Sequence, residues 1–216
     1  MQRALPFVAL ALLACGGEEP VVQEGRYLPL AVGASWTFRV TDQSGAVFQK
    51  SSTVEELEEL GGKKTGIVAF RVRTSNPDGI TLSWQEDRGS AVVRHREQEL
   101  SRDGRVTAEE IYVPYKLRLD ESPERLRMGA KAKETYTETH VDPGTGKHSE
   151  VTKTELWTVE SIDEPVVAGG NTYKGLRVRR ENPETGVTKT YWFARDVGKV
   201  REQGGQDEEL VAHSVP

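Results

Sequence analysis

Residues 71–84 read RVRTSNPDGITLSW, two short runs of β-forming residues joined by an Asn-Pro-Asp-Gly turn. The proline supplies a φ of about −65° and the glycine tolerates a positive φ, as a tight hairpin turn requires. The second run, from Ile80 to Trp84, alternates apolar with hydroxyl side chains, so we expect one of its faces to be buried. The stretch therefore predicts an antiparallel β-hairpin.

Similar runs rich in Val, Thr, Tyr, Phe and Trp recur along the chain and are broken by Gly, Pro, Asn and Asp, which is typical of an all-β protein. Trp36, Phe38 and Val40 alternate with polar residues and predict a strand with one buried face. Helix is scarce, because Val54–Leu60 fits either two helical turns or a strand with exposed glutamates, and Ser122–Arg125 fits a single turn. We expect further strands at residues 46–55, 67–72, 91–98, 106–119, 132–141, 148–160, 172–180, 187–194, 197–202 and 208–214.

Residues 177–192, RVRRENPETGVTKTYW, repeat the first hairpin roughly a hundred residues later. Trp192 then matches Trp84, although β-rich sequence with Asn-Pro turns can also align with itself by chance. Because no linker interrupts the middle of the chain, we expect one β domain, residues 27–216, with two similar halves, approximately 27–120 and 121–216. The expected fold is an antiparallel curved sheet or open half-barrel with little helix.

The N-terminus has the parts of a secretory signal. Arg3 supplies a positive charge, Ala4–Leu13 form a ten-residue apolar run, and Ala14 precedes Cys15, the only cysteine of the chain. A membrane-spanning helix needs about 20 apolar residues, so this run is too short to be one. The segment LLAC (residues 12–15) resembles the lipobox of bacterial lipoproteins. That resemblance implies removal of a signal peptide, residues 1–14, and acylation of Cys15, with a diacylglyceryl group on its thiol and a further acyl chain, such as palmitate, on its amine.

The lipobox predicts a location in the bacterial cell envelope. Several acyl chains give stable anchoring, whereas one binds membranes reversibly. Gly16 follows Cys15, and in the enterobacterial version of the signal this implies the outer membrane, with the protein facing the periplasm or the cell surface. Residues 15–26 are rich in Gly, Glu and Pro, so they are predicted to be a flexible tether. An ordinary cleaved signal and a wrongly chosen start codon are the alternatives.

The composition excludes two classes of partner. The net charge is −5, and basic residues are interleaved with acidic ones. We therefore expect neither nucleic acid nor an anionic lipid surface to bind, and we expect membrane contact through the Cys15 anchor alone. With one cysteine, no intrachain disulfide can form.

Two motifs resemble those of a group of uncharacterised bacterial lipoproteins. Residues 29–38, PLAVGASWTF, match an opening motif in which Phe38 replaces the usual tyrosine. Residues 192–200, WFARDVGKV, match a closing motif, and residues 166–178 resemble a strand pair with two inserted residues. The resemblance implies an antiparallel β fold, such as the open half-barrel of lipoprotein carriers, and no activity.

The best candidate for a metal site is the polar hairpin around Gly144. If its turn centres there, His140 and His148 face each other and could bind Zn²⁺ with Asp142 or Glu150. The segment has the composition of an exposed hairpin tip, and nothing around it suggests the supporting hydrogen bonds that a metal site needs. We therefore expect no metal.

No pattern of catalytic residues is present. The sequence lacks a G-x-S-x-G nucleophile motif and an H-E-x-x-H metal motif. Residues 60–65, LGGKKT, resemble the end of a phosphate-binding loop, but Leu57 occupies the position of its first glycine. We expect a non-enzymatic protein without a cofactor.

The aromatic residues bear on the predicted function, a membrane-anchored, non-enzymatic binding or interaction module. The four tryptophans each fall in a predicted strand, and large aromatic side chains most often fill a core. They could instead line an apolar face that receives a lipid, a hydrophobic peptide or another hydrophobic ligand. An interaction module for an envelope protein is the second hypothesis, and an enzyme or metal-binding protein the third. The candidate ligand-facing residues are Trp36, Trp84, Trp157 and Trp192.

Overall fold

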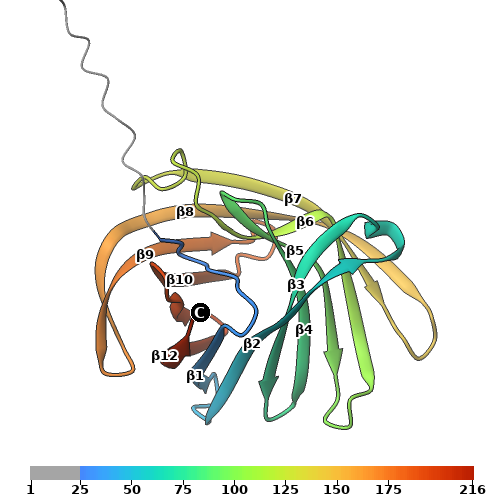
Figure 1. The fold of residues 1–216 in the computed structure, drawn as a ribbon. Coiled ribbons are helices and arrows are strands. Elements are labelled where there is room, and N and C mark those ends of the chain that lie inside the picture. Colours follow the sequence, from blue (N-terminus) through green and yellow to red (C-terminus); the bar gives the residue numbers. More distant parts are fainter. Residues whose placement is uncertain (1–24) are drawn as a thin grey trace, which may run out of the picture.

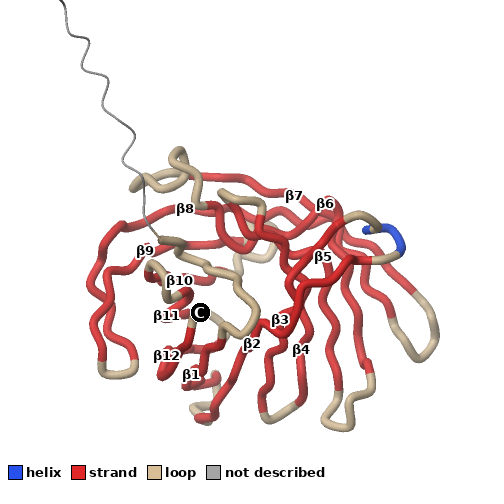
Figure 2. The backbone as a smooth tube through the Cα atoms, in the orientation of Figure 1, coloured by secondary structure: helices blue, strands red, loops and turns tan. Residues whose placement is uncertain are grey.

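The computed structural model describes residues 25–216, which form one closed antiparallel barrel of twelve strands (Figure 1). The prediction of an all-β protein with little helix is confirmed, and Figure 2 shows a single short helical segment in this part of the chain. The elements are β1 (Ser35–Asp42), β2 (Val47–Leu60), the 3-10 helix η1 (Gly62–Lys64), β3 (Ile67–Asn76), β4 (Gly79–Asp87), β5 (Ala91–Leu100), β6 (Val106–Asp120), β7 (Lys131–Val141), β8 (His148–Ala168), β9 (Asn171–Glu181), β10 (Thr188–Ala194), β11 (Gly198–Gln203) and β12 (Gln206–Ser214).

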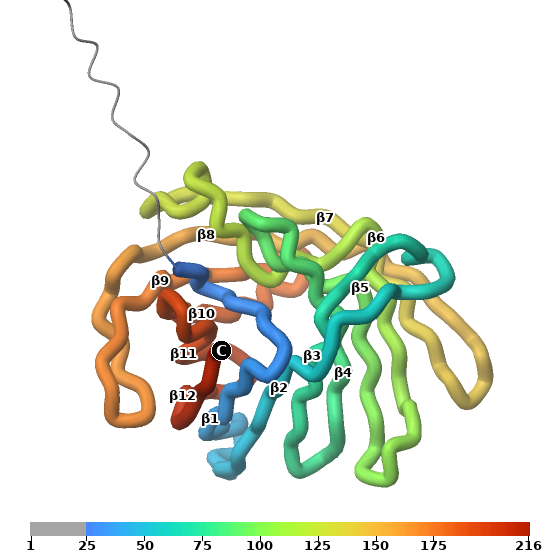
Figure 3. The backbone as a smooth tube through the Cα atoms, in the orientation of Figure 1, coloured from blue at the N-terminus to red at the C-terminus, as the bar shows by residue number. Residues whose placement is uncertain are grey.

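The prediction of an open curved sheet or half-barrel is wrong, because the first strand pairs with the last. The β1–β12 ladder runs from Ser35 opposite Ser214 to Asp42 opposite Gln206. Figure 3 shows β1, in blue, beside β12, in dark red. Long twisted strands curl a sheet, and closure pairs the backbone groups that two free edges would leave open.

Two segments with ambiguous sequence signals are settled by the structure. Val54–Leu60 belongs to strand β2, not to a helix. Ser122–Arg125 forms a turn, in which the Ser122 carbonyl accepts hydrogen bonds of 2.9 Å from the N–H groups of Arg125 and Leu126. Pairing with β3 decides the first segment, because tertiary contacts override the weak local preferences of a short charged run. The second segment forms the single turn that its sequence predicts.

The two related sequence stretches form equivalent hairpins, β3–β4 and β9–β10. Arg71 lies opposite Trp84 in the first, and Arg177 lies opposite Trp192 in the second. Each predicted half of the chain contributes six strands to the barrel. These matched features support the two-fold repeat, which stays a prediction.

The interior of the barrel is largely polar. In β4 the polar side chains therefore point inward, and the apolar ones point outward. Thr81, Ser83 and Gln85 line the interior cavity. The alternate side chain of Trp84 lies on the outer face, where it packs with Leu60 and Ala69. Ser83 and Gln85 are nevertheless buried. The apolar face of β4 is therefore covered from the outside, and its polar face forms the cavity wall.

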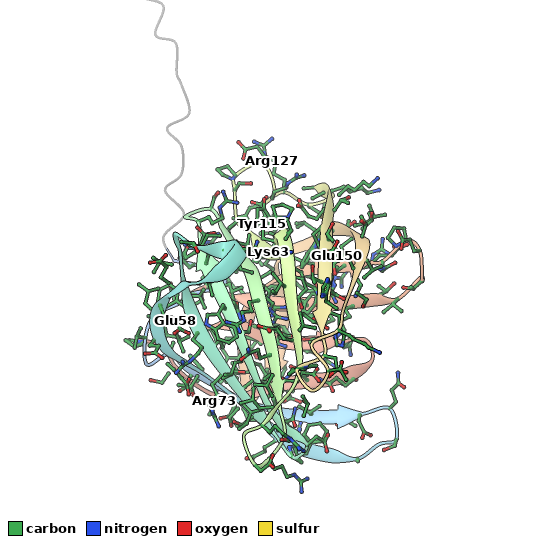
Figure 4. All side chains as sticks on the ribbon, turned by 90° about the vertical axis from the view of Figure 1, so that its right-hand side faces the viewer. Glu58, Lys63, Arg73, Tyr115, Arg127 and Glu150 are labelled. Atoms are coloured by element: carbon green, nitrogen blue, oxygen red, sulfur yellow. The ribbon has the colours of Figure 1, made fainter. Side chains whose placement is uncertain are left out.

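The outer surface of the barrel carries many charged side chains (Figure 4). Lys63, Arg127 and Glu150, which the figure labels, are all exposed. Ion pairs join neighbouring strands on this surface, such as Arg71 with Glu55 at 2.9 Å. Across residues 25–216, no helix is both long and apolar enough to cross a membrane.

The N-terminal segment, residues 25–34, runs across one opening of the barrel before β1 begins (Figure 1). The Glu121 carboxylate accepts hydrogen bonds from the backbone N–H groups of Tyr27 at 2.8 Å and Leu28 at 3.1 Å. Tyr27 is buried, and Leu28 and Leu30 line the interior cavity. The segment therefore forms part of the cavity wall at this opening. The predicted signal peptide, Cys15 and most of the tether lie outside the described residues.

Candidate ligand-binding cavity

The barrel encloses a cavity of about 390 Å³. This volume lies within the range of small-molecule sites in proteins, roughly 300 to 1,000 Å³. Inward-facing side chains from strands around the barrel form its wall, because alternate residues of every barrel strand point inward. Apolar, hydroxyl and charged groups all contribute, so the cavity suits a ligand that is itself both apolar and polar.

One wall of the cavity is aromatic. The rings of Trp157 and Tyr191 stack with centroids 6.1 Å apart, and those of Tyr191 and Phe193 with centroids 6.0 Å apart. Trp36 and Phe38 of β1 also line the cavity. These five rings, here called the aromatic wall, supply apolar surface that a ligand could cover.

The four tryptophans of the sequence prediction divide into two pairs. Trp36 and Trp157 line the cavity, whereas Trp84 and Trp192 lie on the opposite face of their strands. An arginine covers each outer ring: the guanidinium of Arg96 lies 4.6 Å from the Trp84 ring centroid, and that of Arg201 lies 5.6 Å from the Trp192 ring centroid. Cation–π contact and burial together account for this outer pair as structural residues.

A network of paired charges lies at one side of the cavity. The ammonium of Lys199 lies 2.5 Å from a Glu202 carboxylate oxygen and 2.6 Å from one of Glu208. Lys189 contacts Glu202 at 2.8 Å, and Lys50 contacts Glu208. This lysine–glutamate network is defined by Lys50, Lys189, Lys199, Glu202 and Glu208. Each of its charges has at least one partner of opposite sign, so it resembles a satisfied buried ion cluster.

Contacts between opposite charges explain the shifted pKa values of Lys199 and Glu202. Burial opposes the charge of Lys199, but the adjacent Glu202 and Glu208 carboxylates raise its pKa. Burial likewise opposes the charge of Glu202, yet Lys199 and Lys189 lower its pKa. The adjacent opposite charges therefore favour the charged forms of Lys199 and Glu202.

A second set of charges on the cavity wall contains mostly cations. We call it the arginine group, and it consists of Arg94, Lys116, Arg118 and Arg180. Arg94 pairs with Glu97, and Arg180 lies 3.3 Å from Glu155. The two remaining members make no ion pair with any carboxylate of the described chain.

Lys116 and Arg118 are the unpaired members. The Lys116 ammonium lies 4.9 Å from the Tyr112 ring centroid and 5.7 Å from that of Tyr136. Burial, and then the positive charge of Arg94, lower the pKa of Lys116 to about 8. The Nε atom of Arg118 is buried without a hydrogen-bond partner, and burial together with Arg94 lowers its pKa as well.

The sequence shows that these two cations alternate with apolar residues. It does not show which face of the strand points into the barrel. Lys116 and Arg118 alternate with Leu117 and Leu119, and the two leucines are buried in a core cluster with Val159. An alternation of cations and leucines normally indicates a strand with its charges in solvent. Only the barrel geometry shows that the charged face points into the cavity.

The predicted histidine pair does not form. The Asp142 N–H donates to the Lys147 carbonyl at 2.8 Å, so His148 lies opposite Val141 and His140 lies opposite Ser149. A shift of one residue places the two imidazoles on opposite faces of the hairpin. In the part of the chain that the structure describes, no three His, Cys, Asp or Glu side chains converge on a metal position.

No family model matches the chain, and no curated protein matches it. Two solved structures are similar to it at 12% sequence identity. One is a candidate exported protein with a YmcC-like fold from Bacteroides fragilis, with a TM-score of 0.49 over 88% of this chain and 100% of the other. The second is a candidate lipoprotein from Parabacteroides distasonis, with a TM-score of 0.40 over 88% of this chain and 99% of the other. Similarity at this level does not extend to a site or an activity, and the motif-based resemblance to uncharacterised lipoproteins stays a prediction.

Proposed function

We propose that this protein is a lipid-anchored envelope protein that binds a small amphipathic ligand inside its barrel without chemically changing it. The observation that carries the proposal is the cavity of about 390 Å³ enclosed by the strands. A filled core would leave no such space, because protein interiors pack to the density of organic crystals.

The chemistry of the wall decides which ligands fit. The aromatic wall favours an apolar body, whereas the hydroxyl and charged side chains favour at least one polar group. A ligand without polar groups would leave Lys116 and Arg118 desolvated and without a partner among the described residues, at a cost of several kcal/mol. The sequence-based hypothesis of a lipid or other hydrophobic ligand is therefore narrowed to an amphipathic one.

The proposed anchor predicts which opening of the barrel lies closer to the membrane. The described chain begins at Gly25, ten residues after Cys15. Ten extended residues span at most about 36 Å. The N-terminal segment that crosses one barrel opening would therefore lie close to the membrane surface, and we infer that the ligand is exchanged at or near the membrane.

Ligand binding is tested with a variant that fills the cavity. Thr81 lines the cavity, so Thr81→Phe should occupy ligand space, whereas Thr53→Phe places the same ring on an exposed position of β2. The soluble Cys15→Ser form of each protein would be titrated with decanol and decanoate, and Trp fluorescence would be recorded. We expect binding to the parent protein and to Thr53→Phe, with at least tenfold weaker binding to Thr81→Phe.

Native mass spectrometry of the full-length protein extracted from membranes would identify a bound small molecule. Failure of the parent protein to bind either probe, together with the absence of a co-purifying ligand, would overturn the proposal. Such a result would favour the second sequence hypothesis, an interaction module for an envelope protein.

A further inference from the structure

The two groups of charges in the cavity differ in their balance. The lysine–glutamate network has three cations and two carboxylates, all joined by contacts between opposite charges. The arginine group has four cations, and within residues 25–216 Glu97 and Glu155 are the carboxylates that pair with them. The arginine group therefore carries an excess of positive charge inside the barrel.

This excess is concentrated at Lys116 and Arg118. Both line the cavity, and both lie close enough to Arg94 and Arg180 for the four like charges to repel one another. Burying an unpaired charge is costly, so an arrangement of this kind disfavours the empty folded protein. An acidic group in the cavity would remove both the repulsion and the missing hydrogen bonds.

The surroundings of the group match an acid with an apolar body. The Arg180 guanidinium lies 5.9 Å from the Trp157 ring centroid and 5.6 Å from that of Tyr191. Apolar surface and cations are thus adjacent on one wall. Among the described residues, the buried N–H of Trp157 has no hydrogen-bond partner.

We propose that the arginine group binds the oxyanion of an amphipathic acid, a carboxylate or a phosphate or sulfate monoester, whose apolar body covers Trp157, Tyr191 and Phe193. This inference rests on the proposed function, because it names the ligand class of the same cavity. Guanidinium groups present paired donors that match the oxygens of carboxylates and phosphates. Arg118 is assigned as the main donor, since it lines the cavity and pairs with no carboxylate of the part of the chain that the structure describes.

The test compares ligands of one chain length and different charge. Decanoate, decyl phosphate, decanol and decylamine would be titrated into the soluble Cys15→Ser form by calorimetry. We expect the two acids to bind at least tenfold more tightly than decanol, and decylamine to bind more weakly than decanol. The ratio of decyl phosphate to decanoate affinity distinguishes the two kinds of oxyanion.

Two substitutions test the assignment of this site, one in the arginine group and one control outside it. Arg118→Met removes the unpaired cation and should weaken binding of the acids about 10- to 100-fold, the range for a hydrogen bond to a charged group, with decanol affinity unchanged. Arg39→Met removes a cation from the outer surface, where the exposed Arg39 side chain lies 2.6 Å from Glu209 and outside the cavity wall. Acid affinity should change less than threefold in this matched control.

The fold of the variants is checked by their melting temperatures. Removal of Arg118 relieves repulsion, so the Arg118→Met protein should melt at or above the temperature of its parent, and Lys116→Met provides a second variant of the same kind. Equal binding of decanol and decanoate, or an undiminished preference for acids in both variants, would overturn this inference while leaving the proposed function intact. If none of the four probes binds, the proposed function fails as well.

Discussion

At the scale of single residues, the cavity combines satisfied and unsatisfied charges within one barrel. Lys199 has two carboxylate partners, whereas Lys116 faces Arg94 and Arg180 and is close to aromatic rings. Natural proteins retain arrangements that cost stability chiefly where function needs them. The unpaired cations therefore stand out from a protein whose other cavity charges are paired.

The lowered pKa of Lys116 predicts how stability depends on pH. The unfolded lysine has an ordinary pKa of 10.5, and the folded one has a pKa of about 8. Between these values the unfolded chain binds the proton and the folded protein does not, so the free energy of unfolding rises with pH. We expect a rise of about 1 to 3 kcal/mol between pH 8 and pH 10.

Urea denaturation at pH 7, 8, 9 and 10 measures this rise. Lys116→Met should be more stable than its parent at pH 7 and should lose much of the increase, while Lys50, whose pKa burial also lowers, keeps part of it. Above pH 10 the trend should reverse, because burial raises the pKa of Tyr112 and Tyr136 and the folded state then resists their ionisation. An identical pH profile in the variant and its parent would contradict the assignment of the rise to Lys116.

At the scale of elements, the N-terminal segment is held by one side chain. The Glu121 carboxylate accepts two backbone N–H groups and lies 3.3 Å from the Arg26 guanidinium. The Glu121 side chain is only 5% exposed, so these interactions are poorly screened by water. They fix the segment that crosses one opening of the barrel.

Substitution of Glu121 should loosen this segment while the barrel stays folded. Glu121→Ala leaves two amide donors without their acceptor, which costs about 1 to 3 kcal/mol. Hydrogen exchange at the Tyr27 and Leu28 amides should accelerate at least tenfold, with the strand amides unchanged. Glu124→Ala, an exposed acid of the same loop, is the matched control. Unchanged exchange at Tyr27 and Leu28 would show that Glu121 does not hold the segment.

At the scale of the whole molecule, closure creates the cavity. Strand β1 has β2 on one side and β12 on the other, so every strand of the barrel has two neighbours. An open sheet with the same sequence would expose the charged inner face and the aromatic wall to solvent. The ligand site that we propose therefore exists only in the closed form.

A designed disulfide tests closure directly. Ser35 lies opposite Ser214 in the β1–β12 ladder, so Ser35→Cys with Ser214→Cys, in the Cys15→Ser background, should oxidise readily. In the chain-entropy model a ring of this length stabilises the fold by about 5 kcal/mol. Mass spectrometry and melting curves with and without reductant measure both effects. Ser35→Cys with Ser90→Cys, which the ladder does not pair, should stay reduced, and the same result for the first pair would contradict a closed barrel.

Part of the fold could be predicted from local sequence. The hairpin turn at Pro77-Asp78 and the short alternating runs predict antiparallel strands, because turn chemistry and the two-residue period act over a few residues. The histidine hairpin shows the limit of this reasoning: Asp142 pairs with Lys147, and this register moved His148 to the other face. A single residue of register changes every side-chain neighbour.

The candidate site was less accessible to sequence reasoning. Alternation predicts that a strand has two different faces, and it does so correctly at Trp36 and Trp84. It does not state which face points into a barrel, because a polar cavity reverses the usual order of apolar inside and polar outside. Two of the four predicted tryptophans, Trp84 and Trp192, consequently lie outside the cavity, and Arg118 was missed.

By itself the sequence determined the local features of this protein: a lipobox that predicts its location, an all-β composition, and hairpins with Asn-Pro turns. Only the tertiary structure decided that β1 meets β12 and that Lys116 and Arg118 share a cavity with Trp157. The physical reason is distance along the chain. Turns and alternation depend on neighbouring residues, whereas closure and the placement of charges depend on contacts between segments that no local pattern specifies.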